Sequence, residues 1–181
     1  MEHEANADVT VTALNELQRC LGQDVAQRWL LVDVHAQRLW LMKQTEAHST
    51  WPISTSAVGL DSRQDSGGTP PGVHRIAGKI GQGKPSGTVF ESRQPTGKIW
   101  LPDEARDDDL ILTRILTLTG CEPGLNQGGS VDSMERYIYL HGTNHEAQIG
   151  QPVSHGCVRL TNGDICQLFD LVSEGDAVVI I

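Results

Sequence analysis

The segment "SHGCVRL", residues 154–160, places a histidine and a cysteine two positions apart around a glycine. A second histidine–glycine pair occurs in "RYIYLHG", residues 136–142, so that His141 precedes Cys157 by 16 positions. The apolar and aromatic alternation of "RYIYLHG" predicts a β-strand that ends at His141. Because side chains at strand ends commonly form functional sites, the two segments predict a sheet that carries a reactive centre.

The chemistry of this pair starts from the thiol. A cysteine is nucleophilic only as the thiolate, and an unperturbed thiol has a pKa of about 8.5. We expect His141 to be the base for Cys157, because it comes from a separate strand and can approach the thiol directly; His155 is the other candidate. A helix predicted to begin near Thr161 would also place its positive end close to Cys157.

Each reactive residue has a glycine beside it: Gly156 precedes Cys157, and Gly142 follows His141. Gly156 removes a side chain beside the nucleophile, so the N–H groups of Gly156 and Cys157 are candidates for an oxyanion hole. Gly142 would let its carbonyl orient the imidazole of His141. Together these features are typical of acyl transfer through a thioester.

Two other interpretations stay open at this point. A single histidine–x–cysteine pattern is most often structural. Alternatively, His141, His145, His155 and Cys157 could ligate zinc, but their spacings match no common zinc module. No metal site and no cofactor is therefore predicted.

The composition narrows the function classes. The chain has 181 residues, enough for one domain, with a formal net charge of −9 and a pI of about 5.1. This acidic balance argues against partners such as nucleic acid or a membrane surface. The acidic run at residues 103–109 is interpreted as a solvated loop. Surface or loop positions are expected for His3, His35, His48 and His74.

The cysteines and the first residues of the chain indicate the cellular compartment of the protein. No C-x-x-C pair occurs, and three cysteines are interpreted as small buried hydrophobic residues: Cys20, Cys121 and Cys166. The opening "MEHEANADVT" has neither a basic nor an apolar region of a secretory signal. We therefore expect a cytoplasmic protein, or a periplasmic one if a leader has been removed.

The periodicity predicts a mostly β chain with one or two packed helices. Residues 9–21 have the spacing of a helical face, with Thr10 or Thr12 as the cap. Residues 29–35 and 38–43 predict a strand pair, residues 59–98 predict turns joining short strands, and residues 109–118 predict another strand. A second helical face at residues 165–172, capped by Thr161 or Asn162, precedes a closing strand at 177–181.

The motifs "YLHGTN", "IGQPVSHGCVRL" and "GTPPGVHRI" resemble the signature of the L,D-transpeptidase catalytic-domain family, also called the YkuD domain. The resemblance covers residues 29–181 and leaves residues 1–28 as a separate N-terminal helical segment. It implies a β-sandwich of mixed sheets with a capping helix, here preceded by an N-terminal helix. It also implies a peptidoglycan stem tetrapeptide or muropeptide as the substrate, cleaved between diaminopimelate and D-Ala.

The resemblance assigns roles to individual residues. Cys157 matches the nucleophile, His141 the base, and His155 a residue that shapes the pocket. The carbonyl of Gly142 matches the group that orients the base. Arg159 matches a position that binds substrate or orders the loop.

The fate of the acyl-enzyme defines the function. Water as the acceptor gives an L,D-carboxypeptidase, which we expect for a chain without a leader; an amine acceptor gives an L,D-transpeptidase that forms 3→3 cross-links or exchanges D-amino acids. A non-catalytic peptidoglycan-fragment binder is the third alternative. A free carboxylate calls for arginine, and the expected substrate-binding residues are Arg159, Ser154, Arg114 and Arg136.

Overall fold

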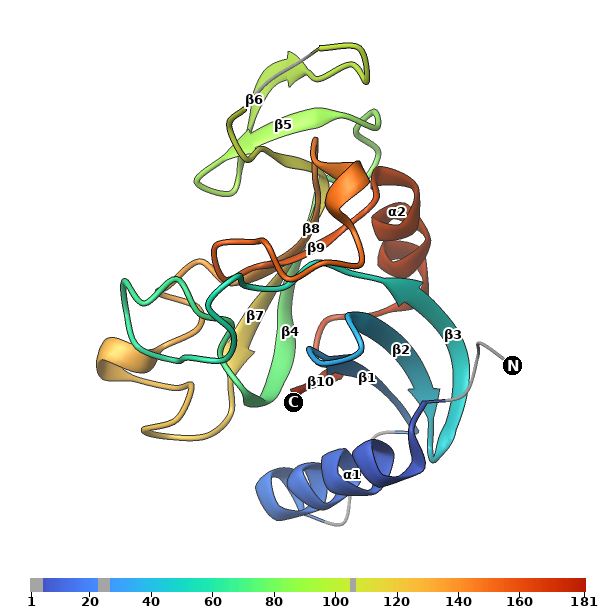
Figure 1. Ribbon diagram of the computed structural model, residues 1–181, viewed down its shortest axis with the longest axis vertical. Coiled ribbons are helices and arrows are strands. Elements are labelled where there is room, and N and C mark those ends of the chain that lie inside the picture. Colours follow the sequence, from blue (N-terminus) through green and yellow to red (C-terminus); the bar gives the residue numbers. More distant parts are fainter. Residues whose placement is uncertain (1–4, 23–26, 105–106) are drawn as a thin grey trace.

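The computed structural model describes residues 5–22, 27–104 and 107–181, and within them it shows a mixed β-sheet with one α-helix on each side (Figure 1). The strands are β1 (Arg28–Asp33), β2 (Arg38–Lys43), β3 (Glu46–Pro52), β4 (Gly72–Ile80), β5 (Thr88–Glu91), β6 (Gln94–Ile99), β7 (Ile111–Gly120), β8 (Tyr139–Gly142), β9 (Val158–Leu160) and β10 (Ala177–Ile180). The helices are α1 (Ala7–Leu21) and α2 (Asn162–Leu171), with short 3₁₀ turns at Gly129–Val131 and Glu146–Gln148. The mostly β class predicted from the sequence is confirmed.

The sheet runs in the order β3-β2-β1-β10-β4-β7-β5-β6, and β8 pairs with both β7 and β9. Two pairs are parallel, β1 with β10 and β8 with β9, and the other named pairs are antiparallel. Strand β7 therefore connects two halves of the sheet that fold toward each other. The main core lies between these halves and contains Leu30 of β1, Leu140 of β8 and Phe169 of α2.

Strand β1 explains why "WLLV" is apolar at every position. Leu30 and Val32 belong to the main core, whereas Trp29 and Leu31 face a second cluster beneath α1. A strand that is buried on both faces carries a continuous apolar run instead of an alternating one. The predicted pairing with residues 38–43 is confirmed as the antiparallel β1–β2 hairpin.

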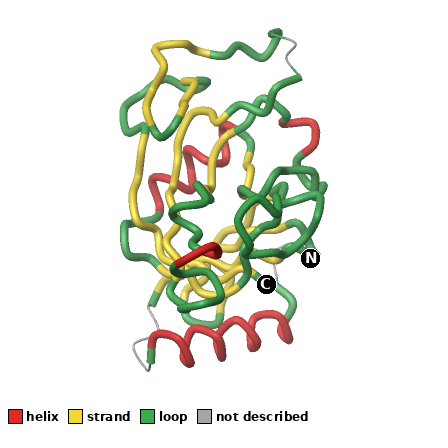
Figure 2. The backbone as a smooth tube through the Cα atoms, turned by 90° about the vertical axis from the view of Figure 1, so that its left-hand side faces the viewer, coloured by secondary structure: helices red, strands yellow, loops and turns green. Residues whose placement is uncertain are grey.

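Helix α1 packs across the outer face of the sheet, as a separate layer below the strands (Figure 2). Ala13 and Leu17 are its most buried apolar residues. The predicted caps were wrong: the side chain of Asn6 accepts a hydrogen bond from the Asp8 N–H at 2.9 Å, and the helix begins at Ala7. Thr12 lies inside the helix, where its hydroxyl donates to the Asp8 carbonyl. Neither described helix has an apolar run long enough to cross a lipid bilayer.

Helix α2 packs against β7, β8 and β9 and follows the predicted pattern. The hydroxyl of Thr161 accepts from the Asp164 N–H at 3.1 Å, which confirms Thr161 as the cap. Ile165, Leu168 and Phe169 are fully buried.

Two local predictions differ from the structure. The strand expected at 136–142 begins only at Tyr139, because Tyr137 has a φ of +58° and lies in a turn. His74 was expected at the surface, but it is fully buried in β4, where Nε2 lies 2.9 Å from the Ser133 hydroxyl. His35 and His48 are exposed as expected, and His3 lies outside the described residues.

The burial of His74 predicts that the folded state loses stability at acid pH. Burial lowers its pKa to about 4, from about 6.5 in the unfolded chain, so only the unfolded state takes up a proton between these values. This contribution to stability is present above pH 6.5 and is lost as the pH falls toward 4, by about 2–3 kcal/mol at the acid end. Urea unfolding of wild type and His74→Gln at neutral and acid pH should show a smaller acid loss in the variant. The matched control His48→Gln should keep the wild-type slope, and equal slopes for all three proteins would contradict the prediction.

Candidate active site

The parallel pair β8–β9 places His141 and Cys157 on the same face of the sheet. Leu140 pairs with Val158 and His141 with Arg159, so Cys157 lies one step before β9, opposite Tyr139. Leu140 and Val158 point into the core beneath α2. Because side chains alternate along a strand, Tyr139, His141, Cys157 and Arg159 point to the opposite face.

The sulfur of Cys157 is positioned by the backbone before β8. The Tyr139 N–H donates to Sγ at 3.3 Å, and the thiol donates to the carbonyl of Tyr137 at 3.3 Å. The turn at Tyr137 thus takes part in placing the nucleophile. The Cys157 side chain is partly exposed, so a substrate has access to it.

His141 has one defined tautomer. It is 3% exposed, and its Nδ1 lies 2.7 Å from the carbonyl of Gly142. A carbonyl only accepts, so Nδ1 carries the proton and Nε2 is left with a lone pair. Gly142 is required here for a second reason, because a Cβ at this position would lie 2.5 Å from Asn162 Oδ1 and 2.8 Å from the Leu112 carbonyl.

The loop before Cys157 depends on the upstream "GTPPG" turn. The buried hydroxyl of Thr69 donates to the Gly156 carbonyl at 3.0 Å. Gly156 has a φ of +125°, and a Cβ there would lie 3.1 Å from the carbonyl of Gly68. Both observations explain why the position before the nucleophile is glycine.

Ser154 stabilises this loop from within. Its hydroxyl donates to the Cys157 carbonyl at 2.6 Å and accepts from the Gly156 N–H at 3.3 Å. The residue is 3% exposed. These hydrogen bonds make Ser154 a part of the turn, and its predicted contact with substrate stays a prediction. The structure also directs the Gly156 N–H, a predicted oxyanion donor, toward this hydroxyl.

Arg159 is buried beside the reactive pair and forms an ion pair. It is 2% exposed and lies 3.1 Å from Asp109, and it also donates to Ser54 and Gln148. These contacts agree with the loop-ordering role considered for Arg159, and substrate binding by this residue stays a prediction. Its place next to His141 in the register also makes it an electrostatic neighbour of the site.

Asp109 is the residue that sequence reasoning missed, because residues 103–109 were interpreted as a solvated loop. Its carboxylate contacts Arg159 with one oxygen and lies 3.4 Å from His155 Nδ1 with the other. Burial acts to raise its pKa, but Arg159, His141 and His155 outweigh burial and the pKa is lowered. Nothing in a run of similar acidic residues marks the one that folds back onto the site.

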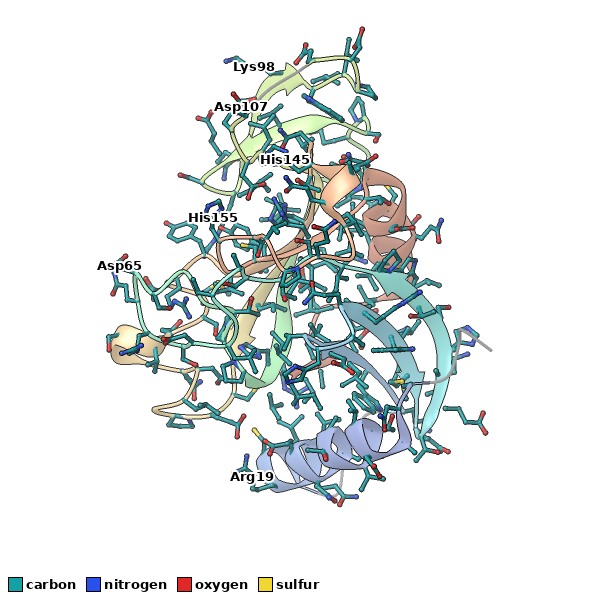
Figure 3. The ribbon with its side chains drawn as sticks, in the orientation of Figure 1. Arg19, Asp65, Lys98, Asp107, His145 and His155 are labelled. Atoms are coloured by element: carbon teal, nitrogen blue, oxygen red, sulfur yellow. The ribbon has the colours of Figure 1, made fainter. Side chains whose placement is uncertain are left out.

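His155 is the exposed member of this network. Its side chain is 86% exposed, and it projects outward on the same side of the molecule as Asp65 (Figure 3). It lines a hollow of about 520 Å³ together with Gly67, Arg136 and Tyr137. This position agrees with a pocket-shaping role, and it leaves His141 as the buried candidate base.

The two remaining predicted arginines, Arg114 and Arg136, lie in different parts of the structure. Arg114 donates to the carbonyls of Lys84 and Thr113 and lies over the Phe169 ring, on the α2 side of the sheet. A substrate role for Arg114 stays a prediction. Arg136 lines the hollow and donates to the carbonyls of Asp61 and Gly68.

Arg93 is a further residue that the sequence did not reveal. It lies in the β5–β6 turn, where its guanidinium donates to the Tyr139 hydroxyl at 2.8 Å and lies 4.4 Å above the Tyr137 ring. Both tyrosines contact the Cys157 sulfur through their backbones. The β5–β6 hairpin is thereby connected to the nucleophile, although the two are far apart in sequence.

Burial favours the neutral form of both the Cys157 thiol and the His141 imidazole. Burial raises the pKa of Cys157 to about 11, with the Tyr139 N–H acting in the opposite direction. Burial also lowers the pKa of His141, against the Gly142 carbonyl and Asp109. Strand β9 lies between Cys157 and α2 in the sequence, and the expected help from the positive end of this helix stays a prediction.

The sheet, the two helices and the thiol–imidazole arrangement define a mostly β protein with a cysteine-centred site. A family model described as "L,D-transpeptidase catalytic domain" (YkuD) matches residues 27–180. The chain belongs to this family.

Individual curated proteins that are similar to this chain are also named L,D-transpeptidases. The chain is 28% identical to "Probable L,D-transpeptidase ErfK/SrfK" of Salmonella typhimurium over 167 residues, which cover 91% of this chain and 47% of that protein. It is 54% identical over 43 residues to "Probable L,D-transpeptidase YbiS" of Escherichia coli, covering 24% of this chain and 14% of that protein. The chain thus spans about half the length of its relatives, or less.

Solved structures share the fold. An L,D-transpeptidase from Mycobacterium smegmatis superposes with a TM-score of 0.51 at 21% identity, over 86% of this chain and 59% of that one. The L,D-transpeptidase LdtMt1, solved in complex with imipenem, gives 0.52 at 18% identity, over 86% and 59%. At these identities the similarity shows the fold alone.

The Arg159–Asp109 pair predicts a stability effect. Asp109→Asn leaves the buried Arg159 charge without its carboxylate, so we expect the free energy of unfolding to fall by about 2–3 kcal/mol. Asp107→Asn is the matched control, because Asp107 lies on the same acidic segment and is exposed. Urea unfolding measures both variants. Equal stability of the two would show that Asp109 is only a surface charge.

The neutral pair predicts a distinct pH profile for alkylation. With a pKa of about 11, the thiolate fraction of Cys157 rises about tenfold per pH unit through the neutral range. The rate of iodoacetamide labelling at Cys157, followed by peptide mass spectrometry, should rise accordingly and show no plateau near neutrality. A plateau that begins below neutral pH would instead reveal a preformed thiolate–imidazolium pair.

Proposed function

We propose that this protein is an acyltransferase of peptidoglycan stem peptides, in which Cys157 is the nucleophile and His141 the general base. The observation that carries the proposal is the shared face of β8 and β9, on which a partly exposed thiol and a buried imidazole of defined tautomer are offset by two residues in the strand register. The family supplies the substrate class. Relatives that are named L,D-transpeptidases favour transfer to an amine acceptor.

The proposed reaction begins with a neutral pair. His141 Nε2 accepts the proton of the Cys157 thiol as the sulfur attacks the carbonyl between diaminopimelate and the terminal D-Ala. The tetrahedral intermediate collapses to a thioester, and the leaving amine of D-Ala takes the proton back from His141. Burial lowers the pKa of His141 and thereby favours this return.

The second half of the reaction depends on the acceptor. An amine that attacks the thioester gives its proton to His141 and forms a new amide bond, which is transpeptidation; the carbon–sulfur bond breaks, and the departing Cys157 sulfur takes the proton back from His141. Water in the same position gives a free acid, which is the carboxypeptidase reaction expected from the sequence. Both outcomes use the same two residues, so the acceptor that reaches the thioester decides between them.

Arg136 is the proposed reader of the donor carboxylate. It lines the hollow that also contains His155 and Tyr137, next to the loop of Cys157. The nearby sulfur tends to raise the Arg136 pKa, and burial, the larger influence, lowers it. Arg136 is the arginine among the three predicted substrate-binding arginines that lines this hollow.

Product analysis tests the proposal. Incubation with a free stem tetrapeptide should release D-Ala, and an added D-amino acid should appear in the product when transfer outcompetes hydrolysis. Cys157→Ala should abolish both reactions, and His141→Gln should reduce them by about 10²–10⁴-fold. Intact substrate with a reduced Cys157 would refute the proposal, and retained peptide binding would then indicate a non-catalytic binder.

A variant of Arg136 separates recognition from folding. Arg136→Lys should lower the preference for the tetrapeptide over its C-terminal amide by about tenfold, because the bidentate contact to the carboxylate is lost. A purely structural role would lower the rates for acid and amide equally. Arg114→Lys serves as the control and should leave the preference unchanged.

A further inference from the structure

Two cysteines that are distant in sequence meet on the side of the sheet that carries α1. Cys20 lies in the last turn of α1, and Cys121 directly follows β7. The Cys20 thiol donates to the Cys121 carbonyl at 3.6 Å, across a separation of 101 residues. Both side chains are partly buried and pack against the same apolar cluster, which lies beneath α1.

Neighbouring contacts keep these two segments together. Arg19 lies at the end of α1 and forms an ion pair with Glu122 at 2.8 Å (Figure 3). The other Glu122 oxygen accepts from the Val73 N–H at 2.7 Å, and the Cys121 N–H donates to the Val73 carbonyl at 2.9 Å. The residue next to each cysteine is therefore bonded to the other segment or to β4.

The pKa shifts of the two thiols agree with the contact between Cys20 and Cys121. Burial raises the pKa of Cys121 to about 11, and the charge of Cys20 raises it further. Burial also raises the pKa of Cys20, while Arg19 and Arg75 lower it. The geometric basis for a bond between the two side chains is the approach of the Cys20 sulfur to within 3.6 Å of the Cys121 backbone.

We propose that Cys20 and Cys121 form a redox-active dithiol, which converts to a disulfide and links α1 covalently to the end of β7. The oxidant is a disulfide compound, either a small molecule or an exchange protein. One cysteine thiolate attacks this disulfide and displaces the first thiol, forming a mixed disulfide. The other thiolate then attacks the protein sulfur and displaces the second thiol, so two protein thiols are oxidised and one external disulfide is reduced.

The remaining cysteines stay outside this reaction. Cys157 lies on the β8–β9 face, and Cys166 lies in α2, on the other side of the sheet from α1 (Figure 1). The proposed bond therefore does not consume the nucleophile. Its consequence is mechanical: it closes a loop of about 100 residues and keeps α1 on the sheet, which restricts the unfolded chain and raises thermal stability.

Oxidation of the intact protein tests the proposal. Treatment with excess oxidised glutathione at mildly alkaline pH should decrease the mass by two hydrogens, and non-reducing peptide mapping should recover one linked pair that contains Cys20 and Cys121. The Tm of the oxidised protein should rise by about 5–10 °C and return on reduction. Because the thiol pKa values are raised, the rate of linkage should increase with pH.

Matched variants distinguish this bond from general oxidation. Cys20→Ser and Cys121→Ser should each abolish the linked peptide and the rise in Tm, whereas Cys166→Ser should retain both. Glutathione attached separately to Cys20 and Cys121, without a link between them, would overturn the proposal. So would two thiols that stay reduced at alkaline pH, or a linked pair that contains Cys166.

Discussion

The parallel pairing of β8 with β9 is the constraint on which the site depends. Its register puts His141 beside Arg159 and Cys157 opposite Tyr139, so all four side chains point away from the core beneath α2. A shift by one residue would exchange the buried and exposed faces and would place the thiol in the apolar core. The core residues of both strands thus set the register that the chemistry requires.

Burying the polar groups of this site costs free energy, and their hydrogen bonds and ion pairs offset this cost. His141 satisfies Nδ1 with the Gly142 carbonyl, and the buried guanidinium of Arg159 forms an ion pair with Asp109. A buried cation without a partner would be strongly destabilising, whereas a neutral thiol and imidazole need no counter-charge. The site therefore combines one compensated ion pair with two uncharged reactive groups.

Sequence reasoning succeeded where the signal was local. The apolar spacing of α2, the cap at Thr161 and the continuous apolar run of β1 all depend on neighbouring residues, and the structure agrees with each. It failed where the decisive partner was distant. Asp109 resembled a solvated acid and His74 resembled a loop residue, because the ion-pair partner of Asp109 and the burial of His74 come from segments far along the chain. The helix α1 cap at Asn6 was missed for a smaller reason, since several capping residues stand close together.

The sequence by itself determined the class of fold, the family motifs and the identity of the candidate nucleophile and base. These follow from residue type, spacing and strand alternation, which are properties of short segments. Only the tertiary structure decided which arginine faces the hollow, which acid balances Arg159, and which two thiols meet across α1 and β7. The physical reason is that burial and pairing are relations between segments: a side chain has no fixed environment until the sheet brings distant residues together.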